Sequence, residues 1–84
     1  MERKVGVVTH YFGKIGVAAI ELAEDLRVGD TIHVKGHTSD FVQRVDSLQL
    51  DHGMVDSGHA GESVGMKLAG HAREHDEVYK VIAD

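Results

Sequence analysis

The feature that most restricts the fold of this chain is a series of short runs in which apolar and polar residues alternate, each bounded by glycine. The clearest run covers residues 31–35, where Ile32 and Val34 share one face of a strand, and it follows a tight turn at Gly29-Asp30. A strand with one apolar face cannot bury that face alone, so the other runs must supply its neighbours in a sheet.

Five further runs have strand-like patterns. They cover residues 5–12, 15–22, 41–50, 64–68 and 78–82. Gly13-Lys14 joins the first two, which predicts a hairpin with a type II′ turn, because glycine at the first central position accepts the positive φ. A helix over residues 17–26 is the alternative for the second run, since it contains good helix formers, but it lacks an N-cap residue.

The long run over residues 41–50 changes phase. Phe41 and Val45 share one parity and Leu48 and Leu50 the other, so a bulge or bend near Asp46-Ser47 is needed to bury all four. Strands spaced about ten residues apart, with glycine between them, predict one all-β domain over residues 1–84. Closure into a barrel would also pair the edge strands.

The composition favours a binding module over a complete enzyme. A chain of 84 residues buries only about 60–65% of its unfolded surface, which leaves little core for a deep catalytic cleft. The absence of cysteine excludes disulfides and thiolate sites and fits a cytoplasmic location. The pattern shows neither a signal peptide nor a membrane span. The net charge of −5 disfavours general attraction to phosphate, although it leaves a local basic patch open.

Several segments lie in the order and spacing of a known family. Residues 28–32 (VGDTI) and 60–68 (AGESVGMKL) resemble domain 2 of translational GTPases of the elongation factor Tu type. Residues 9–18 and 32–41 resemble more closely small stand-alone elongation-factor-like proteins and the C-terminal domain of U32-family peptidase-like proteins. The resemblance spans nearly the whole chain. It implies a single six-stranded Greek-key closed barrel of the translation-protein type.

The resemblance also implies what is missing. A translational GTPase hydrolyses nucleotide in a separate domain, and Gly13-Lys14 is followed by isoleucine and does not complete a phosphate-binding loop. The U32-type catalytic region is absent as well, so we expect no GTP binding, no cofactor and no catalytic residues. Gly29 and Gly61 are expected to form the turns that lead into strands, with Asp30 and Glu62 accepting hydrogen bonds from turn amides.

The main functional expectation is a non-enzymatic translation-factor-like module that binds tRNA or ribosomal RNA, or that assists a larger RNA-acting protein, because the family resemblance favours it. Lys35, Arg44 and Lys67 are expected to face outward from strands, with His33 and His37 close by in sequence. The alternative is a protein-interaction module that pairs with a separate catalytic chain, such as a U32-type protein. The acidic net charge suits a protein partner better.

A third hypothesis concerns metal binding. Residues 71–75 (HAREH) match H-x-x-E-H, in which two histidines on a helix hold zinc and the glutamate serves as base. Gly70 and the strand-like Val78 leave barely two helical turns, so we expect a solvated loop or single turn, with His71 and His75 as metal ligands only in the alternative. Residues 37–40 and 56–59 contain the residue types of a catalytic triad without its sequence context.

Overall fold

The computed structural model describes residues 1–82, and within this range the chain consists of strands and connecting loops. The strands are β1 (Glu2–Phe12), β2 (Val17–Leu22), β3 (Leu26–Arg27), β4 (Thr31–Lys35), β5 (Asp40–Arg44), β6 (Leu48–Leu50), β7 (Gly53–Val55), β8 (Ser57–Gly58), β9 (Ser63–Lys67) and β10 (Glu77–Val81). The all-β prediction is confirmed. Nothing in the described range is a helix of the kind that crosses a bilayer.

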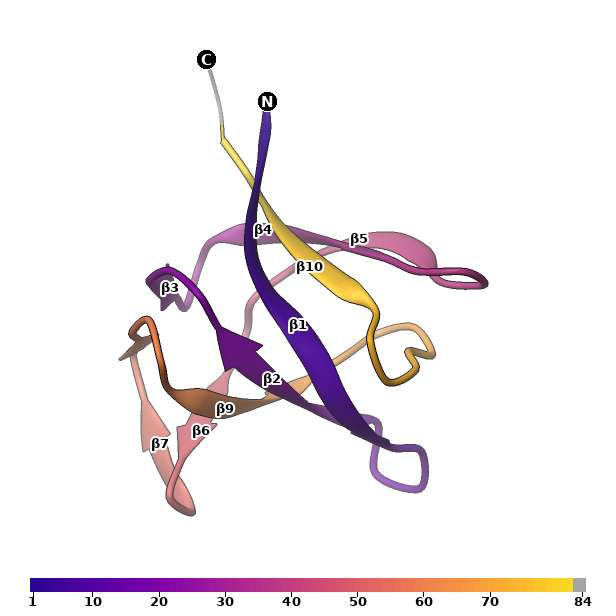
Figure 1. The fold of residues 1–84 in the computed structure, drawn as a ribbon. Coiled ribbons are helices and arrows are strands. Elements are labelled where there is room, and N and C mark those ends of the chain that lie inside the picture. Colours follow the sequence, from indigo (N-terminus) through magenta and orange to yellow (C-terminus); the bar gives the residue numbers. More distant parts are fainter. Residues whose placement is uncertain (83–84) are drawn as a thin grey trace.

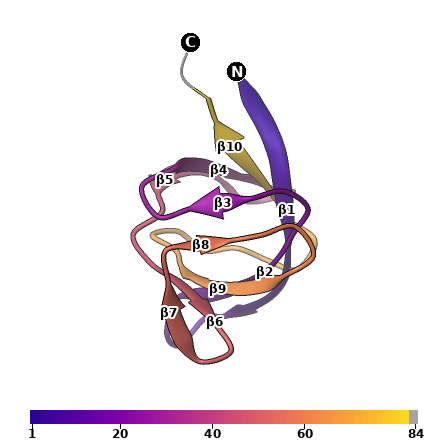
Figure 2. The ribbon, with the colours of Figure 1, turned by 90° about the vertical axis from the view of Figure 1, so that its left-hand side faces the viewer.

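Eight of the strands form one strongly curled antiparallel sheet in the order β5-β4-β10-β1-β2-β9-β6-β7 (Figure 1). β3 and β8 form a separate two-stranded pair that lies across one side of the curled sheet (Figure 2). The expected closed six-stranded Greek-key barrel is not confirmed, because β5 and β7 are the two edges of the sheet and no backbone ladder joins them. There are also more strands than expected, since the run 41–50 divides into β5 and β6, and the short strands β3, β7 and β8 are added.

The concave side of the curled sheet holds an aliphatic core. The side chains that are fully buried and largest are Ile20, Leu26, Ile32, Leu48, Met66, Val5, Val8, Val34, Val45, Val64 and Val78. Alternation along the strands explains most of the set, because every second residue of a strand faces the same side. Val5 and Val8 have opposite parity but are both buried, and the register of β1 shifts between Lys4 and Gly6 and between Val8 and His10. The predicted inward face of residues 31–35 is therefore confirmed.

The bend predicted near Asp46-Ser47 is also confirmed. β5 ends at Arg44 and β6 begins at Leu48, and both Val45 and Leu48 are fully buried on either side of the break. The Val45 amide donates to the Asp30 carbonyl at 2.8 Å, which holds the chain against the start of β4. The break allows the two parities of the run to reach the same core.

The turn between β1 and β2 differs from the prediction. The positive φ lies at Gly16 (67°), and Gly13 has no positive φ. The amides of Ile15 and Gly16 both donate to the Phe12 carbonyl, at 3.2 and 2.9 Å. The type II′ turn at Gly13-Lys14 is therefore wrong, because a longer loop with a left-handed final glycine makes the reversal and β2 starts only at Val17.

The two other predicted turns are confirmed. Gly29 and Gly61 have φ values of 100° and 89°. Asp30 Oδ2 and Glu62 Oε1 each accept a hydrogen bond from the backbone amide three residues earlier, at 2.9 and 2.7 Å. Both motifs are thus turns stabilised by their own carboxylate.

The first and last strands lie beside each other. Glu2 is the partner of Val81 in the β1–β10 ladder, and the Ile82 amide donates to the Met1 carbonyl at 2.8 Å. Residues 1 and 82 therefore lie at the same end of the molecule (Figure 1).

Candidate functional site

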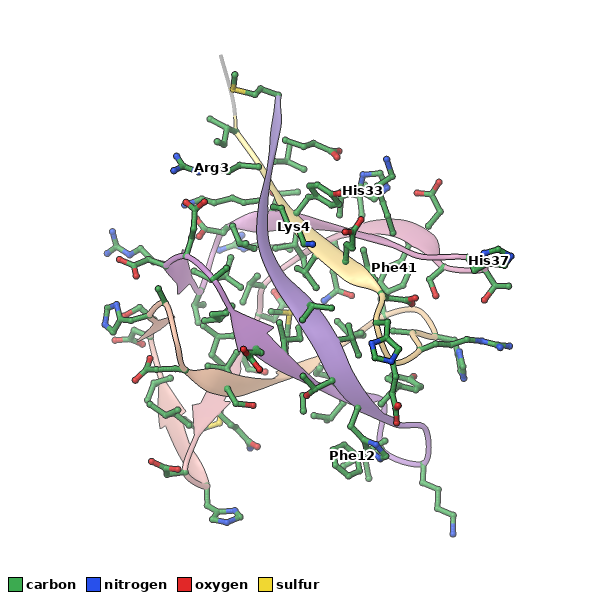
Figure 3. All side chains as sticks on the ribbon, viewed as in Figure 1. Arg3, Lys4, Phe12, His33, His37 and Phe41 are labelled. Atoms are coloured by element: carbon green, nitrogen blue, oxygen red, sulfur yellow. The ribbon has the colours of Figure 1, made fainter. Side chains whose placement is uncertain are left out.

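The residues predicted to bind RNA separate into two groups. In the β4–β5 ladder Lys35 pairs with Asp40 and Thr31 with Arg44, so Lys35 and Arg44 lie at opposite ends. Their positions differ by four residues along the strands of this hairpin, which corresponds to about 13 Å at the rise per residue of a β-strand. Lys35, His33 and His37 belong to the β4–β5 hairpin, with His37 at its tip (Figure 3). Arg44 and Lys67 instead line a groove beside β5.

One row of side chains crosses four strands on the outer face of the sheet. Lys4 of β1 is the ladder partner of Tyr79 of β10, which pairs with His33 of β4, which pairs with Val42 of β5. His33 and Lys4 both lie on this face in Figure 3. Residues far apart in the sequence therefore form one continuous strip.

His33 is held between two carboxylates in this strip. Its Nδ1 lies 2.7 Å from Glu2 Oε2, its Nε2 contacts Asp40 Oδ1, and its side chain is only 15% exposed. The hydrogen bonds to Asp40 and then to Glu2 raise the pKa of His33 above its ordinary value. The same contact lowers the pKa of Asp40. The charged imidazole thereby links β1, β4 and β5.

Glu77 of β10 joins two other residues of the strip, Lys4 and Tyr79. It accepts hydrogen bonds from Lys4 Nζ at 2.8 Å and from the Tyr79 hydroxyl at 2.9 Å. The hydrogen bond between Lys4 and Glu77 raises the pKa of Lys4 and lowers that of Glu77, and the bond to Glu77 raises the pKa of Tyr79. Lys35 Nζ lies 5.7 Å from the centre of the Tyr79 ring.

These contacts reduce the positive charge that the strip presents to a phosphate backbone. Lys4 and His33 are each paired with a carboxylate, whereas Lys35 lies over the Tyr79 ring and keeps its charge. Binding to RNA gains affinity from cations that neutralise phosphates, and paired cations supply less of that gain. RNA binding stays a prediction, and the strip is better suited to hold four strands together.

A groove runs along the other side of β5. It has a volume of about 270 Å³ and is lined by Gln43, Arg44, Asp46, Ser47, Lys67, Leu68 and Ala69. The Gln43 side chain bridges it: Nε2 donates to the Lys67 carbonyl at 3.0 Å, and Oε1 accepts from the Ala69 amide at 2.6 Å. One side-chain amide thus makes the link between β5 and β9 that a closed barrel would make with a backbone ladder.

The H-x-x-E-H motif lies in a loop. Residues 71–75 contain a turn and no helix, and His75 has a φ of 74°. The His71 ring packs edge-on against Tyr11, with ring centres 4.7 Å apart. Within residues 1–82 no three His, Cys, Asp or Glu side chains are grouped to hold a metal ion. The loop expected for this motif is present, and the helix that the zinc alternative requires is not.

Sequence reasoning missed the partners in the strip and the bridge made by Gln43. Glu2, Asp40 and Glu77 are acidic residues on strands and lie opposite the basic Lys4 or His33, and outward residues of opposite charge are a signal for cross-strand pairs. The signal could be used only once the strand order was known, because Glu2 and His33 lie 31 residues apart.

Comparison with known proteins supports part of the family resemblance. The fold is that of the C-terminal domain of a U32 peptidase-like protein of Geobacillus thermoleovorans. Its crystal structure has a TM-score of 0.89 at 20% identity, covering 95% of this chain and 93% of that one. A selenomethionine variant of the same domain gives 0.86 at 19% identity, covering 90% and 96%.

In sequence, the chain is similar to an uncharacterized protease of Methanocaldococcus jannaschii. It is 43% identical over 77 residues, which are 90% of this chain and 19% of that protein. The chain therefore spans about a fifth of the length of this relative. No protein-family model matches the sequence. The likeness to the U32-type C-terminal domain is thus confirmed for the fold, while the likeness to domain 2 of translational GTPases stays a prediction.

Proposed function

We propose that this chain is a non-catalytic β module that binds a U32-type catalytic chain. The observation that carries the proposal is the 43% identity to a segment making up 19% of a protease. In that relative the equivalent residues occur together with a much larger remainder. The matching fold of a U32-type C-terminal domain supports the same assignment.

The state of Ser39, the serine of the candidate triad in residues 37–40, supports a non-catalytic role. Ser39 is buried, and its hydroxyl donates to the His71 carbonyl at 3.2 Å, so it serves to tie the β4–β5 loop to the loop after β9. A triad serine instead needs a base within hydrogen-bond reach and an exposed hydroxyl. Chemistry would then belong to the partner chain.

The charge distribution favours a protein partner over RNA. The chain carries a net charge of −5, and Lys4 and His33 of the outer strip are paired with carboxylates. A nucleic-acid interface usually presents a surplus of free Lys and Arg on one face.

Affinity purification from the cells that make the protein tests this proposal. A tagged copy is recovered with and without nuclease treatment, and its partners are identified by mass spectrometry. We expect a U32-type chain that is retained after nuclease. Loss of every partner after nuclease, or partners that include no U32-type chain, would show that the proposal is wrong; the first result would favour tRNA or ribosomal RNA as the ligand.

A further inference from the structure

No strand of the described residues pairs with the outer edge of β5, although one of its outward groups, the Arg44 carbonyl, accepts a hydrogen bond from Gln43 Nε2 at 3.4 Å. The Gly36 amide donates to the Ser39 carbonyl and the Val45 amide donates to the Asp30 carbonyl, so the odd-numbered residues on this side of the hairpin exchange hydrogen bonds with β4. The backbone groups of the even-numbered residues of β5 therefore point away from β4. Val42 lies in the middle of this edge, and within residues 1–82 its backbone has no hydrogen-bond partner on that side.

The surroundings of this edge suit an extended peptide. The Val42 side chain is 58% exposed, although it is β-branched and apolar. The adjacent groove has a volume of about 270 Å³, which gives room for one or two peptide side chains. A strand added to a sheet edge gains affinity from backbone bonds and specificity from such pockets.

The charges at the groove indicate the character of the peptide. Arg44 and Lys67 both line the groove and are both exposed, and neither forms an ion pair among the described residues. They differ in this from Lys4, which is paired with Glu77. Asp46 is the acidic residue of the lining and leaves a local surplus of positive charge. A carboxylate placed between Arg44 and Lys67 would complement it.

The opposite edge of the sheet is less suitable. β7 covers only Gly53–Val55, whereas β5 has five residues. Three residues offer fewer backbone bonds, and the lining of the groove beside β5 includes no residue of β7.

We infer that the U32-type chain of the proposed function contributes an extended segment that pairs with β5 as an additional strand and places an acidic side chain between Arg44 and Lys67. The inference rests on the proposed function and adds the surface and the mode of binding to it.

Amide hydrogen exchange tests the inference without any substitution. The full chain is measured alone and with the purified U32-type chain recovered by the affinity experiment. We expect exchange at Val42 to slow by at least about tenfold in the complex, because its amide gains a backbone partner. Binding with unchanged exchange at Val42 overturns the edge assignment and leaves the proposed function standing. Recovery of no U32-type chain overturns both.

Substitutions at the edge give a second, independent readout. Val42→Pro removes the outward amide while sparing the bonds to β4, as proline at an edge strand does, and should weaken binding by at least about tenfold. Val42→Thr keeps the amide and the β-branch and should bind within about twofold of wild type. A folded Val42→Pro variant that binds like wild type contradicts the inference.

Charge variants and the oligomeric state complete the test. Arg44→Gln and Lys67→Gln should each weaken binding several-fold, more strongly at low salt, whereas Lys14→Gln in the exposed β1–β2 loop should not. If the three substitutions weakened binding equally, the proposed acidic side chain between Arg44 and Lys67 would be wrong. Protection of Val42 in the isolated chain at high concentration would assign the edge to a second copy and contradict a U32-type occupant.

Discussion

His33 joins strands that are distant in the sequence. Its ring contacts Glu2 at the start of β1 and Asp40 at the start of β5, while His33 itself belongs to β4. The sequence places His33 on the outer face correctly, through the alternation of residues 31–35. Its two partners were not predicted, because parity along one strand does not tell which other strands lie beside it.

The first prediction concerns the protonation of His33. In Asp40→Asn the pKa of His33 should fall toward its ordinary value of 6.5, because the principal hydrogen-bond acceptor loses its charge. Titration of the imidazole by NMR measures this, with Asp46→Asn as the control on an exposed aspartate elsewhere. A His33 pKa that is the same in both variants would contradict the hydrogen bond between His33 and Asp40.

The contacts of His33 with Glu2 and Asp40 make the free energy of unfolding depend on pH in a defined direction. The folded-state pKa of His33 is raised, so its contribution is fully present below pH about 6.5 and is lost as the pH rises through the raised value. The pKa of Asp40 is lowered, so its contribution is present above its ordinary value of 3.8 and is lost as the pH falls through the lowered one. The difference in unfolding free energy between wild type and His33→Gln should therefore be largest between these limits.

Urea denaturation across pH 3 to 9 measures that difference. A His33→Gln effect that grows toward high pH would have the wrong sign for this pairing.

A second prediction concerns Gly36. A Cβ at this position would lie well inside contact distance of the carboxylate of Asp76, which is buried and accepts a hydrogen bond from the Arg73 amide at 2.9 Å. Gly36→Ala should lower the unfolding free energy by about 1–3 kcal/mol, because the buried carboxylate must move. Gly13→Ala is the matched control, since its Cβ would come no closer than 3.7 Å to a neighbour. Equal stability of the two variants would argue against this packing.

At the scale of elements, sequence patterns predicted the strands better than their connections. The runs around residues 5–12, 31–35, 64–68 and 78–82 became strands because each alternates and buries one face. The β1–β2 turn was placed wrongly, since two glycines flank it and the sequence does not tell which adopts the positive φ. The strands β3 and β8 have two residues each, which is too short to show the alternation of apolar and polar residues that predicts a strand.

The third prediction concerns the bridge between β5 and β9. Gln43→Ala removes the two hydrogen bonds that cross to Lys67 and Ala69, together with a longer one to the Arg44 carbonyl at 3.4 Å. It should lower the unfolding free energy by about 1–2 kcal/mol, because net contributions are about 0.5–1.5 kcal/mol per bond. Gln49→Ala on β6 is the control on an exposed glutamine. Chemical denaturation compares them, and amide exchange at Ala69 should rise in Gln43→Ala alone. An unchanged exchange rate at Ala69 would contradict the bridge.

At the scale of the whole molecule, the resemblance led to the correct U32-type fold but to a barrel more closed than the one observed. Closure depends on whether β5 and β9 meet in register, which is decided by the curl of eight strands and the break at residues 45–47. A local sequence pattern predicts neither the curl of the whole sheet nor the exact geometry of the break. The groove beside β5 was missed for the same reason, although Arg44 and Lys67 had been singled out individually.

The fourth prediction tests whether the core holds the molecule together as one unit. Ile20→Ala removes a fully buried side chain and should cost about 2–5 kcal/mol, because lost burial and a cavity add up. Ile15→Ala changes the same residue type at a position that is 64% exposed and should stay within about 0.5 kcal/mol of wild type. Thermal unfolding followed by circular dichroism separates the two, and similar melting temperatures would contradict the burial pattern.

The adjacency of Met1 and Ile82 bears on how such a domain can be carried by other polypeptides. A host chain can receive the unit at a single point of its own surface, because the incoming and outgoing connections need almost no separation. A short covalent link between the two ends would likewise close the chain into a ring, and new ends could then be opened in the exposed loop at residues 13–16.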